Sequence, residues 1–86
     1  MTTYTYTPKG VCSRRMTVKL EDGIIRDVRI EGGCNGNLQG ISHLVTGMKA
    51  EDAIARMRGI QCGGKPTSCP DQLAAALTQA LEQEKQ

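Results

Sequence analysis

Apolar and polar residues alternate along two stretches of the first third of the chain, on either side of Glu21-Asp22-Gly23. A period of two on both sides of a glycine-bearing turn predicts a β-hairpin over residues 15–31. The alternating apolar positions are Met16, Val18, Leu20, Val28 and Ile30. Residues 3–7 are rich in threonine and tyrosine and end at Pro8, which predicts a further strand at a sheet edge, formed by an N-terminal arm over residues 1–8.

The apolar spacing changes to three or four residues after Gly33-Cys34, as on one face of a helix. This spacing predicts a helix over residues 36–47, and a shorter one over 50–58 has acidic residues in its first turn and arginines in its last. A third helix is expected over 69–83, with Ser68 or Cys69 as its N-cap and Asp71 completing a Ser-x-x-Asp start signal. Residues 82–86, after Leu81, are expected to fray.

Strands first and helices afterwards are typical of an α+β fold. The sequence therefore predicts a three-stranded antiparallel sheet, with the hairpin at its centre, followed by three helices packed on one face. A chain of 86 residues fits one domain, and its twenty large aliphatic side chains make a thin core for that length. A metal ion, an oligomer or a partner would supplement such a core.

Charge and hydropathy narrow the function classes. The chain contains eleven Lys and Arg residues and nine Asp and Glu residues. The basic residues are scattered along the sequence, which argues against a nucleic-acid partner. No apolar run is long enough for a membrane span, and the first residues have neither a basic region nor an apolar core of a signal peptide. We therefore expect a cytoplasmic protein that binds neither nucleic acid nor membrane.

The four cysteines, Cys12, Cys34, Cys62 and Cys69, all fall at predicted junctions between elements. In a reducing compartment they are core thiols, metal ligands or redox-active thiols rather than structural disulfides. Their spacing matches no zinc-finger signature, since paired C-x2-C knuckles are missing. Cys69 is expected at a helix N-terminus, where the helix dipole favours a thiolate, so it is predicted to be the most reactive or most strongly ligating of the four.

Other catalytic signals are weak. His43 lies within a predicted helix and is interpreted as a surface residue. The sequence contains no Ser/His/Asp arrangement, Walker loop or dinucleotide-binding glycine motif. No complete active site is predicted, and whether the protein is an enzyme stays open.

Thr67-Ser68-Cys69-Pro70-Asp71 spells the motif that names the TSCPD domain, and residues 33–41, Gly10-Val11-Cys12 and Cys62-Gly63 also resemble that family. The resemblance, to the short stand-alone form, covers essentially the whole chain, 1–86, as one domain. The same domain occurs at the C-terminal end of some adenosylcobalamin-dependent ribonucleotide reductases. The resemblance thus implies a role near ribonucleotide reduction and DNA precursor synthesis, although this chain is too short for the radical barrel or cobalamin site of those oxidoreductases.

The layout is also similar, more distantly, to iron-sulfur cluster assembly scaffold proteins. That similarity implies that Cys12, Cys34 and Cys69 are the scaffold cysteines. Arg14 and Ser68 replace an Asp and a His of the scaffold pattern, which argues against labile cluster transfer. Cys62 could replace the lost ligand, giving a four-thiolate set suited to zinc or to a cluster.

Three functions follow as hypotheses. The first is a thiolate metal-binding accessory domain, with zinc favoured over an iron-sulfur cluster, whose partner is a ribonucleotide reductase or another protein. The second is a dithiol redox carrier for a reductase that uses Cys62 and Cys69. The third is a scaffold-like protein that handles iron-sulfur clusters, or a small interaction module with structural cysteines.

Overall fold

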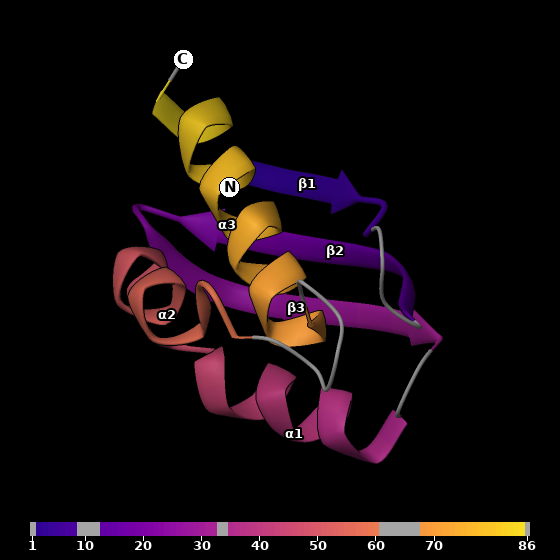
Figure 1. Cartoon of the computed structure of the whole chain (residues 1–86). Coiled ribbons are helices and arrows are strands. Elements are labelled where there is room, and N and C mark those ends of the chain that lie inside the picture. The colour runs from indigo at the N-terminus through magenta and orange to yellow at the C-terminus, as the bar shows by residue number, and fades with distance from the viewer. Residues whose placement is uncertain (1, 9–12, 33–34, 61–67, 86) are drawn as a thin grey trace.

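The computed structural model describes residues 2–8, 13–32, 35–60 and 68–85, with residues 13 and 35–38 described by their backbone alone. Three strands precede three helices within these ranges (Figure 1), so the predicted α+β fold is confirmed. The elements are β1 (Thr2–Tyr6), β2 (Ser13–Glu21), β3 (Ile24–Gly32), α1 (Asn35–Val45), α2 (Ala50–Met57) and α3 (Cys69–Lys85).

The sheet is antiparallel with the order β1-β2-β3. β1 lies at an edge of the sheet, as its sequence predicts. The sequence also predicts the hairpin at the centre of the sheet, but only its first strand, β2, is central, and β3 forms the other edge. Asp22 and Gly23 connect β2 to β3 with φ values of 53° and 78°. Two successive residues with positive φ are what a tight type I′ hairpin turn requires.

A register shift in the hairpin brings additional apolar side chains into the core. Lys19 pairs with Asp27 whereas Leu20 pairs with Ile25, so Arg26 is an extra residue in β3. An extra residue of this kind shifts the alternation of side chains by one position, so residues three apart across the bulge lie on the same face. Ile25 and Val28 are therefore both buried although they are three residues apart, which a strict period of two would not allow.

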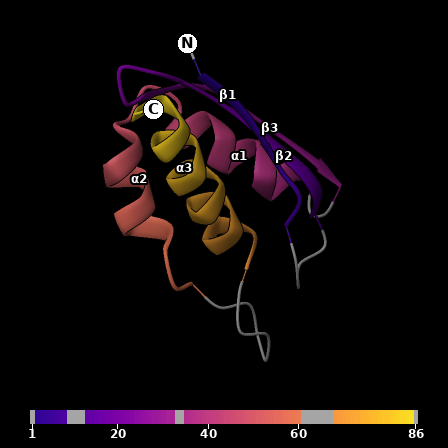
Figure 2. The same cartoon turned by 90° about the horizontal axis from the view of Figure 1, so that it is seen from above.

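All three helices lie on one face of the sheet (Figure 2). α3 packs on β1 and β2, α1 packs along β3, and α2 packs against α3. The buried side of α3 alternates two leucines with alanines, whose small side chains let the helix approach the sheet closely. The core residues are Met16, Val18, Leu20, Ile25, Val28, Val45, Ala50, Ala53, Met57, Leu73, Ala74, Leu77 and Ala80.

The C-terminal helix α3 continues to Lys85. Near its end it contacts the hairpin turn, where the backbone N–H of Gly23 donates a hydrogen bond to Glu84 Oε1 at 2.9 Å. None of the helices in the described ranges combines the length and the apolar character that crossing a membrane requires.

Replacement of Leu77 tests the packing of α3 on the sheet. Leu77 is completely buried, so Leu77→Ala should lower the free energy of unfolding by about 2–5 kcal/mol through lost burial and the cavity left behind. Leu44→Ala is the matched control, because Leu44 is 77% exposed and its truncation should change stability by less than about 0.5 kcal/mol. Urea unfolding measures both, and equal losses would contradict this packing.

Candidate functional site

The first turn of α3 is built on Ser68. Ser68 is 4% exposed, and its Oγ accepts a hydrogen bond from the backbone N–H of Asp71 at 3.2 Å. Its backbone oxygen accepts the first helical bond, from the N–H of Gln72 at 2.8 Å. Ser68 rather than Cys69 is therefore the N-cap, and the predicted start signal is confirmed. Cys69 is then the first helical residue, partly buried and packed against the hydrophobic core.

Asp71 reaches to the end of another helix. Its carboxylate accepts a hydrogen bond from the backbone N–H of Gly59, with an N to Oδ1 distance of 2.7 Å. Gly59 follows α2 with a φ of 84°, a conformation that glycine adopts without steric cost. This bond ties the first turn of α3 to the end of α2.

Tyr6 ties the same turn to the sheet. Its hydroxyl donates a hydrogen bond to Gln72 Oε1 at 3.1 Å, across a separation of 66 residues. Tyr6 is the last residue of β1, so this hydrogen bond joins the end of the strand to the beginning of α3. The first turn of α3 is thus held by contacts from β1 on one side and from α2 on the other.

At the same end of the sheet, Ser13 at the start of β2 pairs with Gly32 at the end of β3. Gly32 has a φ of 83°, and a Cβ on it would lie 3.2 Å from the backbone nitrogen of Arg14. This position therefore requires glycine, because a side chain would be strained by both the backbone conformation and the close approach.

Of the four candidate metal ligands, the structure describes Cys69 alone. Cys12, Cys34 and Cys62 lie outside the described residues, so the convergence of the four sulfurs stays a prediction. Within the described ranges, no three side chains of His, Cys, Asp or Glu come together as a set of metal ligands.

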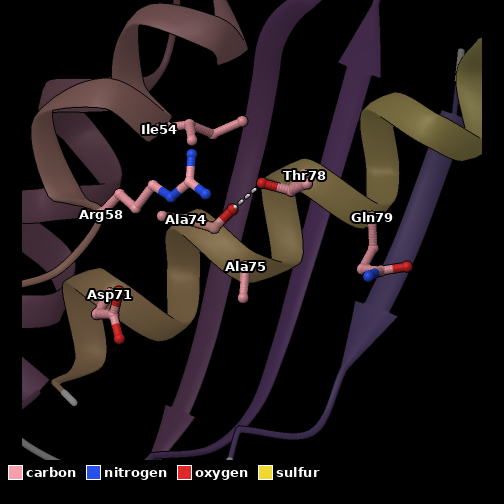
Figure 3. A pocket seen from close by; sticks show the side chains of 7 residues that line it. All are labelled: Ile54, Arg58, Asp71, Ala74, Ala75, Thr78 and Gln79. Carbon is pink, nitrogen blue, oxygen red and sulfur yellow. Dashed lines mark hydrogen bonds between the residues drawn. The ribbon is translucent and has the colours of Figure 1, made fainter. Parts of the chain in front are cut away.

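Two pockets flank the first turn of α3. The pocket in Figure 3 lies between α2 and α3 and has a volume of about 280 Å³. The Arg58 side chain points toward Ala74, and Asp71 lies at one end of the pocket. Its remaining lining residues are Ile54, Ala75, Thr78 and Gln79. A larger groove of about 460 Å³ is mostly apolar and is lined by Ile41, Leu44, Val45, Met48, Ala53, Arg56, Met57, Ile60 and Pro70.

His43, interpreted from the sequence as a surface residue, is exposed on α1. It lines a different pocket of about 300 Å³ together with Asp27, Val28, Ser42 and Thr46. None of these residues belongs to the first turn of α3, so the histidine is not part of the candidate site.

Comparison with protein-family models decides the family. The TSCPD domain model matches residues 1–81 of the 86. The chain belongs to the TSCPD domain family. No curated protein and no solved structure matches this TSCPD chain, and the more distant similarity to iron-sulfur scaffold proteins receives no support.

The residues of the TSCPD motif have different structural roles. Ser68 caps α3, Asp71 binds the end of α2, and Cys69 is held between them. The sequence revealed the cap because capping is local, with a recognisable spacing. It did not reveal the partners Tyr6 and Gly59, because these contacts join residues of different elements and no local spacing predicts them.

Ser68→Ala tests the helix cap. Loss of the hydroxyl leaves the buried start of α3 without its acceptor, so the free energy of unfolding should fall by about 0.5–2 kcal/mol in chemical denaturation. Ser68→Thr keeps an oxygen at the same position and should retain most of this stability. A Ser68→Ala protein as stable as the wild type would show that the cap is not needed.

Proposed function

We propose that this TSCPD domain binds one metal ion, zinc, through the thiolates of Cys12, Cys34, Cys62 and Cys69, and serves as an accessory domain in ribonucleotide reduction. The observation that carries the proposal is the set of contacts at the first turn of α3, where Cys69 lies. Gly59, on the segment that leads to Cys62, is bonded to Asp71 in this turn. The start of β2 and the end of β3, which lead to Cys12 and Cys34, lie at the end of the sheet from which Tyr6 reaches the same turn.

The contacts and the sequence together limit the distance from Gly59 to Cys62, and they relate Cys12 and Cys34 to the paired ends of β2 and β3. Cys62 follows Gly59 by three residues, and Gly59 is bonded to Asp71. At about 3.6 Å per residue, the chain from Gly59 can extend no more than about 11 Å to Cys62. Cys12 directly precedes Ser13, and Cys34 is two residues beyond Gly32, the partner of Ser13 in the sheet.

The chemistry of the donors favours zinc. Thiolates are soft ligands, and four of them suit tetrahedral zinc, or alternatively an iron-sulfur cluster. A bound ion would also stabilise the fold, because the energy of ligation is also energy of folding in small domains. This agrees with a core that relies on alanines at many of its buried helical positions.

The link with ribonucleotide reduction is supported by family membership, since the same domain occurs at the C-terminal end of some ribonucleotide reductases. The described residues provide a scaffold around a cysteine and two pockets. A scaffold of this kind suits an accessory role beside a reductase.

Elemental analysis and ultraviolet-visible spectra of anaerobically purified protein test the proposal. One zinc per chain and no visible absorption is the expected result. Visible charge-transfer bands would instead indicate an iron-sulfur cluster. Metal-free protein with two rapidly exchanging thiols would indicate a dithiol carrier, and either result would overturn the zinc assignment.

Serine variants of two cysteines should differ in severity. Cys69→Ser should abolish zinc retention, because this thiol is fixed in the first turn of α3 and packed against the core. Cys62→Ser should reduce zinc affinity less, since the glycine-rich composition around this residue allows another donor to replace it. Competition with a chromophoric chelator measures both, and a larger loss in Cys62→Ser would contradict the ranking.

A further inference from the structure

The two edges of the sheet differ in how they are covered. The outer edge of β3 is bonded to the segment between α1 and α2, because the N–H of Ile25 donates to the backbone oxygen of Met48 at 2.9 Å. The N–H of Gly47 in turn donates to the backbone oxygen of Ile25 at 2.7 Å. β3 also has the bulge at Arg26 and several charged residues. Bulges, charges and covering segments are the features that keep a sheet edge from pairing with another chain.

The edge formed by β1 has none of these features. This strand contains no charged residue and no proline, and its register with β2 runs without a shift. Within the described ranges β2 is its only strand partner, and no backbone hydrogen bond from outside the sheet reaches it. Figure 2 looks toward this side of the molecule, and the helices lie beside β1 rather than over it. The outward backbone groups of β1 are therefore placed to pair with a further strand.

The sequence of this edge reads the same in both directions. Residues 3–7 are Thr-Tyr-Thr-Tyr-Thr, with Thr5 at the centre. Antiparallel pairing of two copies about Thr5 joins identical residue types at every position: Thr3 with Thr7, Tyr4 with Tyr6, and Thr5 with Thr5. Threonine pairs and aromatic pairs are favourable across antiparallel strands, and this segment carries no charge that would repel its copy.

This register also matches the two faces of the sheet. The three threonines are exposed, whereas Tyr4 and Tyr6 are half-buried and pack against the core on the side of the helices. Since successive residues of a strand point to opposite faces, pairing about Thr5 joins the tyrosine face of one copy to the tyrosine face of the other. A shift by one residue would instead put tyrosines opposite threonines and join unlike faces.

We propose that the β1 edge binds a second copy of this chain, so that two TSCPD domains form a symmetric dimer with one continuous six-stranded antiparallel sheet. The inference goes beyond the proposed function and requires neither a bound metal nor any cysteine. One short strand from each copy makes a small interface, so the dissociation constant should be on the order of 10 μM.

Sedimentation equilibrium of the full-length chain measures the dimer. The protein is kept under reducing conditions, so that disulfides between copies do not contribute. Molecular mass should rise from that of one chain to that of two between low micromolar and high micromolar concentrations.

Thr5→Glu places two carboxylates directly opposite each other at the centre of the interface and should weaken the dimer by about tenfold or more. Thr5 is exposed, so the variant should fold as the wild type does, which far-ultraviolet circular dichroism checks. Thr3→Glu is the matched control, since it adds the same charge to the same strand and face. Its two carboxylates would lie four residues apart along the strands, about 13 Å, where salt screens their repulsion. The dimer of this control should therefore match that of the wild type.

An equimolar mixture of Thr5→Glu and Thr5→Lys supplies the decisive result. Each variant alone places like charges at the symmetry centre, whereas a mixed pair places opposite charges there. The mixture should therefore dimerise at concentrations at which each variant alone is monomeric.

Three results would overturn the inference. The first is a wild-type chain that stays monomeric at high micromolar concentration, which would leave the β1 edge for an extended segment of another protein. The second is a loss of dimer in Thr3→Glu as large as that in Thr5→Glu. The third is a mixture of the two Thr5 variants that associates no better than either variant alone.

Discussion

The packing of α3 across β1 and β2 is the interaction on which the other features of this domain depend. Leu73 and Leu77 are fully buried against the sheet, and the alanines between them allow close approach. At roughly 1.5–3 kcal/mol for each large buried side chain, this helix supplies a substantial part of the hydrophobic stabilisation of a small core. It also fixes the position of its own first residue, Cys69.

Polar contacts then determine what meets each end of this helix. Tyr6 and Gly59 bring the end of β1 and the end of α2 to the first turn, whereas Gly23 brings the hairpin turn to the last. Hydrophobic burial is not directional, but hydrogen bonds are, so the apolar stripe of α3 holds the helix on the sheet and the polar groups set its alignment. This alignment determines where the first turn of α3, and with it the candidate site, lies relative to the sheet.

Local signals in the sequence predicted most of the fold. The hairpin, the three helices and the cap at Ser68 each follow from a period or a spacing within a few residues, and the structure contains all of them. The bulge at Arg26 and the contact between Tyr6 and Gln72 depend on pairing between different segments of the chain. The apolar periodicity within one segment does not predict such pairs. For the same reason the sequence could place four cysteines at junctions without establishing which of them meet.

The separation of 66 residues between Tyr6 and Gln72 has a consequence for how this protein is made. β1 and β2 are synthesised before the helix that covers them. Until α3 emerges, the apolar face of the sheet has no cover from its main partner, and non-local contacts of this kind slow folding. A nascent chain therefore cannot complete this core before α3 is made, so chaperones matter most in the interval between the synthesis of β2 and that of α3.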